Sequence, residues 1–314
     1  MNHFSQTVYH INRSPFQAKT HQVIPSRFMK SPACQVNAEQ IIIRLERQVQ
    51  QTLACKPQAD VQCKGTLEQV LKGFEPQHHV SQHYVGQCSV GQHGVGQYQK
   101  FKQLGIQIQA HQTTIALDFG WTNFVVFLCS DGWGVIPNLH PNNSWLCRVQ
   151  KLQGLQQEIR NHQRQLKTTS LEYQRLQTVV SQIQAALRNQ KGFKESVRQA
   201  MFDRLELLCS SYTTVITESL NVERLYGQVS KRKAIDDLDW WHLLERLERI
   251  TQNQTLVMVS HPNKSLQCAV CQHSSYKNRS GNDFRCQKCG VSPNPDLVAL
   301  LNFWQEWLEQ QTKA

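Results

Sequence analysis

The sequence predicts an α/β protein built on a mixed β-sheet, and three observations indicate it. Three short apolar strands follow one another with tight turns between residues 113 and 136, as in an antiparallel meander. A long segment with helical periodicity comes next, and two further apolar strands follow it, at 213–220 and 255–260. An apolar helix is then expected over 295–310.

The meander begins where the character of the sequence changes, at Thr113. Residues 114–120 read Thr-Ile-Ala-Leu-Asp-Phe-Gly, an apolar strand that ends in an acid and a glycine. Residues 124–129 and 133–136 are the second and third strands, and Ser130-Asp-Gly132 is the hairpin turn between them. The fourth strand, at 213–220, also ends in an acid, Glu218.

The region before the meander is weakly patterned. One amphipathic helix is expected over 38–55 and another over 67–71, and beyond the meander a single helix is expected over 236–250. Residues 77–112 are rich in Gln, His and Gly and contain a repeated Val-Gly-Gln unit, so we interpret them as a low-complexity linker. The alternative is a metal site formed by His78, His79, His83 and His93, although their spacing matches no known ligand pattern.

The 314-residue chain carries a net charge of +11, which favours a polyanionic partner such as a nucleic acid. No apolar run approaches the ~20 residues of a membrane span. No basic stretch followed by an apolar one opens the sequence, so we expect no secretory signal and no membrane partner. The sequence carries no indication of oligomeric state.

The helical segment at 144–209 contains many more cations than acids. Taken alone, this pattern is typical of the solvated face of a helical hairpin. The alternative is a track for nucleic-acid phosphates. The candidates for phosphate contacts are Arg160, Arg164, Lys167, Lys191, Lys194 and Arg198.

Four of the 11 cysteines form two Cys-x-x-Cys pairs, Cys268 with Cys271 and Cys286 with Cys289. Four thiolates can surround Zn²⁺ tetrahedrally, and the two-residue gap lets one tight turn supply two ligands. Two disulfides are the alternative, but they are rare in a chain without a secretory signal. We therefore predict a structural zinc site in a ribbon.

Three acids occupy notable places in the predicted elements. Asp118 ends the first strand, Glu218 ends the fourth, and Asp296 starts the last helix. Each has an ordinary explanation, because Asp favours turns and helix N-termini. In an RNase H-like sheet, however, the three positions converge at one edge. Three carboxylates there can hold two Mg²⁺ or Mn²⁺ ions for phosphodiester hydrolysis.

The motifs around these acids resemble those of the TnpB family and the related type V CRISPR effectors. Ile115-Ala-Leu-Asp-Phe-Gly120 resembles their first RuvC motif, and Val215-Ile-Thr-Glu-Ser-Leu-Asn-Val222 resembles the second. The cysteine pairs with Asn278-Arg279 between them resemble the zinc ribbon, and Asn294-Pro-Asp-Leu-Val-Ala-Leu-Leu-Asn302 stands in place of the third motif. The resemblance covers residues 113–310.

The resemblance implies a RuvC-type, RNase H-like core, and an RNA-guided DNA endonuclease of a transposable element. Its partners would be a guide RNA and a target DNA. It assigns two Mg²⁺ or Mn²⁺ ions to Asp118, Glu218 and Asp296, and a structural Zn²⁺ to the four cysteines. Arg279 joins the cations of 144–209 as a nucleic-acid contact. The expected location is the cytoplasm of a prokaryotic cell, with nucleoid association when DNA is bound.

The implied organisation has seven parts. They are an N-terminal region (1–76), a linker (77–112), RuvC part I (113–143), a basic helical insertion (144–209), RuvC part II (210–262), a zinc ribbon (263–292) and RuvC part III (293–314).

The sequence also departs from the family at five positions. Asn294, Pro295 and Val298 replace an aspartate, an arginine and an asparagine around the third acid, Ser219 replaces an aspartate after Glu218, and Gln272 replaces a glycine after the first cysteine pair. Two alternatives therefore stay open. One is an RNA-guided DNA-binding protein without nuclease activity, and the other is a decayed product of a transposable element.

Overall fold

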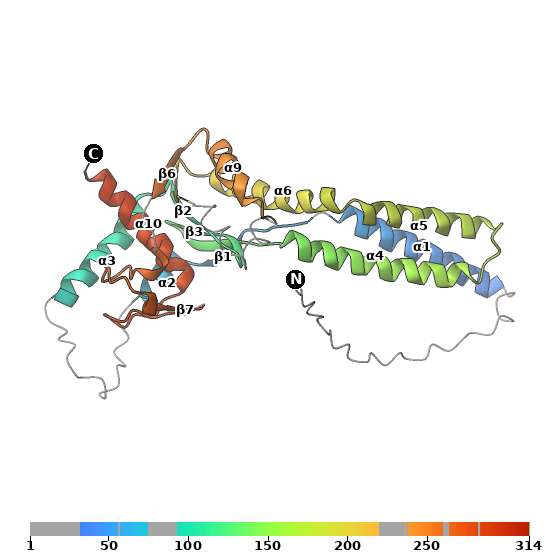
Figure 1. Ribbon diagram of the computed structural model, residues 1–314, viewed down its shortest axis with the longest axis horizontal. Helices are drawn as coiled ribbons and strands as arrows, with labels where there is room; N and C mark the ends of the chain where they lie inside the picture. The colour runs from blue at the N-terminus through green and yellow to red at the C-terminus, as the bar shows by residue number, and fades with distance from the viewer. Residues whose placement is uncertain are drawn as a thin grey trace, which may run out of the picture.

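A mixed β-sheet lies at the centre of the protein (Figure 1). The computed structural model describes residues 32–55, 57–74, 93–219, 236, 238–259, 264–281 and 283–313. The repeated Val-Gly-Gln stretch up to residue 92 lies outside the described residues, as do His78, His79 and His83 of the alternative metal site.

The strands pair in the order β1-β4-β3-β2-β5-β6. β2 (Thr114–Phe119), β3 (Asn123–Cys129) and β4 (Gly132–Pro137) form the expected antiparallel meander. β5 (Thr214–Glu218) pairs with β2 in parallel, and β6 (Thr255–Val259) pairs with β5 in parallel. The predicted α/β class with a mixed sheet is confirmed, and the strand order is consistent with a RuvC-like fold.

The edge strand β1 (Gln62–Gly65) was not predicted. It pairs antiparallel with β4 and adds a strand beyond the meander. Its four residues are polar or small and show no alternation, so the sequence carries no strand signal there. The strand exists because β4 offers an unpaired edge, and Gly134 of β4 lets the two backbones approach closely.

One face of the sheet is covered by α10 (Pro295–Gln311), the predicted C-terminal helix. Leu297, Leu300, Leu301 and Trp304 are all buried, in one cluster with Ala116 and Ile216 of the sheet. Burying each of these large side chains contributes about 1.5–3 kcal/mol. The Trp304 indole also donates a hydrogen bond to the Leu128 carbonyl oxygen, 3.2 Å away, which fixes the helix across the sheet.

The other face is covered by α6 (Gln190–Cys209), the short η4 turn (Trp240–His242) and α9 (Leu243–Ile250). Met201, Phe202 and Leu205 of α6 pack with Ile115 and Leu117 of β2. A continuous helix over 236–250 was expected and is wrong. Asp239 adopts a left-handed backbone (φ 56°), which interrupts the helix before Trp240.

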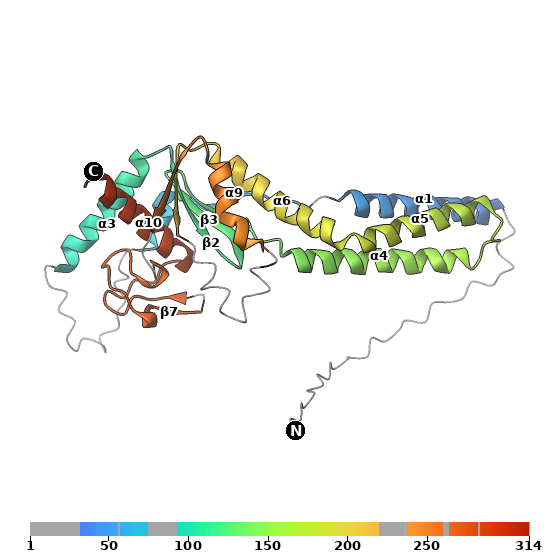
Figure 2. The ribbon, with the colours of Figure 1, turned by 45° about the horizontal axis from the view of Figure 1, so that its top comes forward.

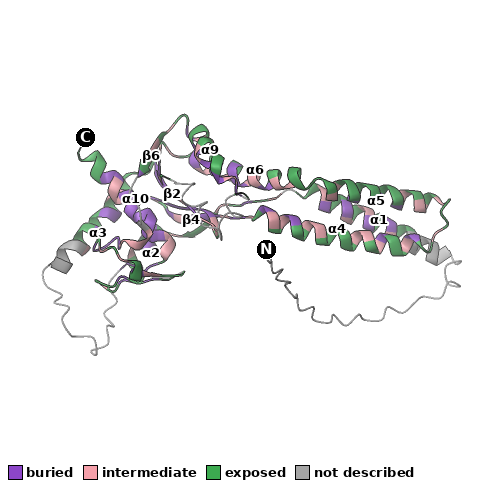
Figure 3. Ribbon diagram, in the orientation of Figure 1, coloured by how far each residue is buried: buried purple, intermediate pink, exposed green. Residues whose placement is uncertain are grey.

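A long helical arm extends from the sheet (Figures 1 and 2). α4 (Pro141–Gln163) runs outward, α5 (Leu171–Arg188) returns, and α6 continues from α5 after a break at Asn189. The expected helical hairpin is therefore present. α1 (Pro32–Ala54) adds a third helix, because Ile42, Leu45 and Val49 pack against buried residues of α4 and α5. Figure 3 shows the outward faces of the arm exposed.

Ion pairs also join α1 to the hairpin. Arg175 of α5 donates to both carboxylate oxygens of Glu46, at 3.0 and 2.6 Å, and Arg44 pairs with Glu158 of α4. The bidentate geometry orients α1 against α5, although exposed pairs contribute only about 1 kcal/mol or less.

The linker expected over 77–112 is wrong for its second part, because His93–Ala110 forms helix α3. Phe101, Leu104 and Ile108 are spaced three and four residues apart and are buried against the α10 side of the sheet. Phe101 also packs on Phe74, which follows α2 (Leu67–Lys72), with ring centroids 5.2 Å apart. The Gly- and Gln-rich composition concealed this apolar stripe.

A small module lies between β6 and α10. It contains the turns η5 (Lys264–Leu266) and η6 (Tyr276–Asn278) and the antiparallel hairpin of β7 (Arg279–Ser280) and β8 (Asp283–Phe284). Within the described part of the chain, no helix combines the length and hydropathy that crossing a bilayer requires.

The pairing of β1 with β4 can be tested with Gly134→Ala. A methyl group at Gly134 would lie 2.4 Å from the Gln62 carbonyl oxygen and 2.5 Å from the Phe127 ring. We expect a loss of about 1–3 kcal/mol in the free energy of unfolding, measured by urea denaturation. Gly154→Ala on α4 is the control, since nothing lies within 4 Å of its added methyl group. It should stabilise the protein by about 0.5–1 kcal/mol. A neutral Gly134→Ala would contradict the pairing.

Candidate active site and metal centre

Asp118 and Glu218 lie beside each other on neighbouring strands. β2 and β5 pair in parallel with Leu117 opposite Thr217, so the next residue of each strand is an acid. Both acids stand where their strands end, and both are partly exposed. The parallel register therefore brings two carboxylates from residues 100 positions apart to the same edge of the sheet.

The third acid comes from the helix above this edge. Side chains alternate along a strand, and Ala116 and Ile216 both face α10. Asp118 and Glu218, two residues further on, face the same way. Asp296 lies in the first turn of α10, where the Asn294 side chain accepts a hydrogen bond from its backbone nitrogen at 2.9 Å. This cap fixes the turn that carries Asp296.

The charges of Glu218 and Asp296 act on Asp118. Burial raises the pKa of Asp118 well above its usual value, and the charges of Glu218 and Asp296 raise it further. Burial also raises the pKa of Glu218. Carboxylates crowded at a desolvated edge repel one another, and a divalent cation between them would relieve that repulsion.

A cation from the small module faces the same acids. The Arg279 guanidinium lowers the pKa of Asp118, against the effect of burial and the two carboxylates. Arg279 belongs to β7, and its Nε donates to the Gly281 carbonyl oxygen at 3.2 Å. Arg279 is one of the nucleic-acid contacts predicted from the sequence, and in the structure its charge acts on Asp118.

A cavity of about 490 Å³ opens next to Asp296. Its lining comes from the loop after β2 (Thr122), the β8 strand (Asp283 and Phe284) and the segment leading into α10 (residues 292–296). Asp283 was not among the sequence candidates. An isolated acid in a polar hairpin carries no signal in a single sequence, and only the fold brings it to this cavity.

The chemistry of these side chains suits hard divalent cations. Asp118, Glu218 and Asp296 offer carboxylate oxygens, which Mg²⁺ and Mn²⁺ prefer.

Two of the positions at which the sequence departs from the TnpB-like motifs have a structural explanation. Pro295 takes the first position of α10, where a missing N–H costs nothing, and Val298 is fully buried in the cluster beneath the helix.

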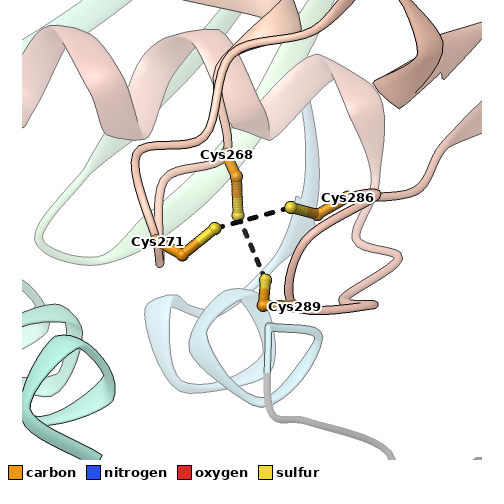
Figure 4. A group of neighbouring side chains, drawn as sticks. All are labelled: Cys268, Cys271, Cys286 and Cys289. Carbon is orange, nitrogen blue, oxygen red and sulfur yellow. Dashed lines mark hydrogen bonds between the residues drawn. The ribbon is translucent and has the colours of Figure 1, made fainter. Parts of the chain in front are cut away.

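The four predicted zinc ligands come together (Figure 4). The Sγ atoms of Cys268, Cys271, Cys286 and Cys289 all lie within 4.8 Å of one another. The Cys268–Cys289 and Cys271–Cys286 distances are 3.6 and 3.5 Å. A tetrahedron with Zn–S bonds of about 2.3 Å has edges of about 3.8 Å, so this cluster could hold Zn²⁺ with little movement.

Tight turns place these thiols. Gly290 follows the second pair with φ 75°, and Gln272 follows the first pair with φ 57°. A glutamine in this left-handed conformation is strained relative to glycine. Its side chain offsets part of that cost by donating to Gln305 of α10 at 2.6 Å and to the Ala269 carbonyl oxygen at 3.2 Å. The same contact holds the small module between β6 and α10 against that helix. This module carries the four cysteines and is called the zinc module below.

The remaining candidate cations lie along the arm, away from the acids. Arg160, Arg164 and Lys167 are exposed where α4 ends and the chain turns toward α5. Lys191 is exposed and Lys194 half-buried in the first turns of α6. Arg198 differs from the others, because it bonds to Glu195 and to the Asp236 carbonyl oxygen, both at 3.0 Å.

Comparison with known proteins adds little to this geometry. No family model matches the chain, and no curated protein matches it. Among solved structures, the chain is similar to the mini-RNA-guided endonuclease CRISPR-Cas_phi3, with 13% identity and a TM-score of 0.35. The match covers 67% of this chain and 46% of the endonuclease, so this chain spans less than half of the length of the endonuclease. A likeness at this TM-score carries no conclusion about function.

The zinc module can be tested with Cys268→Ser. Loss of one thiolate should lower the zinc content, measured by atomic emission, well below one ion per chain, and should lower the melting temperature. Cys147→Ser is the control, because Cys147 is an exposed thiol on α4. A Cys268→Ser variant with unchanged zinc content would contradict the site.

The acid cluster can be tested with Asp118→Asn. Because the pKa of Asp118 is raised in the folded protein, its ionised form destabilises the metal-free fold at neutral pH. The variant should therefore melt a few degrees higher than the parent in EDTA at pH 7. The difference should shrink as the pH falls through the raised pKa toward the usual value of 3.8.

Magnesium should stabilise the parent but not the Asp118→Asn variant. At 100 times its Kd, a ligand stabilises the native state by about 2.7 kcal/mol. Mg²⁺ should thus raise the melting temperature of the parent and leave Asp118→Asn nearly unchanged. An Asp118→Asn variant that is less stable than the parent in EDTA would mean that Asp118 has a structural role in the sheet instead.

Proposed function

We propose that the protein is an RNA-guided, Mg²⁺-dependent DNA endonuclease of a transposable element. The observation that carries the proposal is the parallel register that sets Asp118 and Glu218 side by side at one end of the sheet, with the charges of Asp296 and Arg279 acting on Asp118. Structural ion pairs do not usually gather three mutually repelling carboxylates at a strand edge, whereas hydrolytic metal sites do.

The proposed roles follow from the chemistry of each group. Asp118 and Glu218 hold the metal ions from the sheet, and Asp296 holds them from α10. Two bound divalent ions would activate water and stabilise the leaving oxygen of a phosphodiester. Arg279 supplies a fixed positive charge at a site that otherwise repels the phosphate, and its guanidinium can pair with two phosphate oxygens.

The guided character rests on the motif resemblance over residues 113–310. In that reading the target is recognised by base pairing with RNA, and the protein holds the heteroduplex through its backbone. The exposed Arg160, Arg164, Lys167 and Lys191, with Lys194, suit such contacts because they lie on a projecting arm. Arg198 suits them less, since its guanidinium already bonds within the protein.

The proposed division of the chain has a nuclease core assembled from three separated segments, 113–143, 210–262 and 293–314. The arm at 144–209 and the zinc module at 263–292 are insertions between them. One change is added to this division: α1 and α3 belong with the folded parts, to the arm and to the α10 side of the sheet.

A guided DNA-binding protein that does not cut is the second candidate. The observation that favours it is Val298, which is fully buried one turn along α10 at a position where the family has a polar residue. A buried apolar side chain cannot assist the metal ions. All three acids are present, however, and this favours the enzyme.

The deciding experiment is a cleavage assay. The protein is co-expressed with its native flanking DNA, purified with the RNA it retains, and given Mg²⁺ and a matched duplex. We expect cutting that EDTA prevents and that Asp118→Ala abolishes, with nucleic-acid binding retained. Asp203→Ala is the control, because Asp203 is an exposed acid on α6 that accepts a hydrogen bond from Gln199.

The outcomes separate the two candidates. Target binding without cutting in the parent protein would establish the binding protein. Equal cutting by Asp118→Ala and the parent would show that the assigned site is wrong.

A further inference from the structure

A stacked tryptophan pair lies beside the candidate active site. Trp121 follows the strand that ends with Asp118-Phe119, and its ring stacks on Trp240, with centroids 4.5 Å apart and planes at 24°. Trp240 is only 2% exposed, and its indole nitrogen has no hydrogen-bond partner among the described residues. The pair is therefore held together by ring contact rather than by a polar bond.

The segment leading into α4, where the arm leaves the sheet, is attached to Trp121. Asn138 lies between the end of β4 and the start of α4 and is 9% exposed. Its Nδ2 donates to the Trp121 carbonyl oxygen at 2.7 Å, and its Oδ1 accepts from the His140 backbone nitrogen at 2.8 Å. A buried amide with both ends bonded joins the loop at Trp121 to the first residues of the arm.

The returning helix of the arm is attached to Trp240. Glu195 of α6 pairs with Arg246 at 3.2 Å, and Arg246 pairs with Asp239 at 3.4 Å. The Arg246 guanidinium also lies 4.5 Å from the Phe202 ring centroid. Asp239 immediately precedes Trp240, so this network fixes the backbone that presents the second indole.

The loop held in this way also forms part of the candidate site. Gly120 donates a hydrogen bond to the Phe124 carbonyl oxygen at 3.3 Å, which closes a turn around Trp121 and Thr122. Thr122 lines the cavity that contains Asp296. One side of the loop thus meets the tryptophan stack, and the other side meets the cavity.

We infer that the Trp121–Trp240 stack is the joint through which the arm positions the loop beside the acid cluster. Trp121 is a positioning residue here, since it acts through the loop and not on the reacting atoms. The inference rests on the proposed function for its ligand, a nucleic-acid duplex bound along the arm. A duplex that holds the arm in one orientation would also hold Trp121 and Thr122. The start of α4 is bonded to the Trp121 backbone through Asn138, and α6 is tied through Arg246 to Asp239, next to Trp240.

The test follows hydrogen exchange in the loop. The probe is an RNA–DNA heteroduplex of about 20 base pairs. Exchange in a peptide spanning residues 119–124 is measured with and without this probe, in the parent protein and in variants. The parent should show slower exchange, by several-fold, when the heteroduplex is bound. Trp121→Leu should bind the heteroduplex but lose the slowing, whereas Trp121→Phe should keep it because a ring can still stack.

Two further variants guard against a simple folding defect. Asn138→Ser removes the amide that holds the loop and should reduce the slowing without removing the stack. The stack itself is checked by the exciton couplet of paired indoles in circular dichroism. Trp241→Leu is the matched control, because it makes the same substitution at a neighbouring tryptophan. Trp241 is 45% exposed, and the stacked pair is Trp121 with Trp240. It should behave like the parent.

Cleavage gives the second readout. At saturating target, Trp121→Leu should lower kcat on the order of 10²-fold with little change in Kd for the heteroduplex, and Trp121→Phe should restore most of it. If the loop of Trp121→Leu slows as in the parent, or if the parent loop does not respond to bound heteroduplex, the inference is wrong. If the parent loop responds and Trp121→Leu does not, but the parent never cuts, the inference stands and the nuclease proposal fails.

Discussion

The parallel pairing of β2 with β5 is the contact on which the rest of the site depends. Its register is fixed at the start of the strands, where the Thr113 carbonyl oxygen accepts hydrogen bonds from the Thr213 and Thr214 nitrogens at 2.8 and 3.1 Å. The register continues into β6, and the Ser219 nitrogen donates to the Val259 carbonyl oxygen at 3.0 Å beyond the last residue of β5. A slip of one residue would turn Glu218 to the opposite face, away from Asp118 and α10. The buried apolar residues on both faces of β5 make such a slip costly.

Once that register is set, α10 organises the face above it. The same helix carries Asp296, packs on the sheet through Trp304, and contacts the zinc module through Gln305. The module in turn brings Arg279 toward Asp118. Zinc ligation by the four cysteines would thus be connected to Asp118 through Gln305, α10 and Arg279. Helix α6 of the arm covers the other face of the sheet, and Asn138 at the start of the arm bonds to the loop after β2.

Strands β2 to β6 could be predicted because each is a short apolar run, and α10 because it has a clear helical stripe. The cysteine spacing likewise predicted the cluster. The elements that were missed depend on distant partners. β1 has no pattern of its own and forms only because β4 offers an edge, and α3 hides Phe101, Leu104 and Ile108 among Gly and Gln. Contacts between α1 and α5 join residues 129 positions apart, as at Glu46 and Arg175, and a single sequence carries no sign of them. Asp283 and the Trp121–Trp240 stack were missed for the same reason.

The central claim is that Asp118, Glu218 and Asp296 together bind divalent ions. Crystals grown with Mn²⁺ and measured near the manganese absorption edge would test it most directly, because anomalous scattering locates each ion independently of activity. We expect two manganese peaks about 4 Å apart between the three carboxylates. A separate zinc peak should lie within the four cysteines. Full zinc occupancy with no manganese between the carboxylates would contradict the account and leave the cluster as a structural feature of the sheet edge.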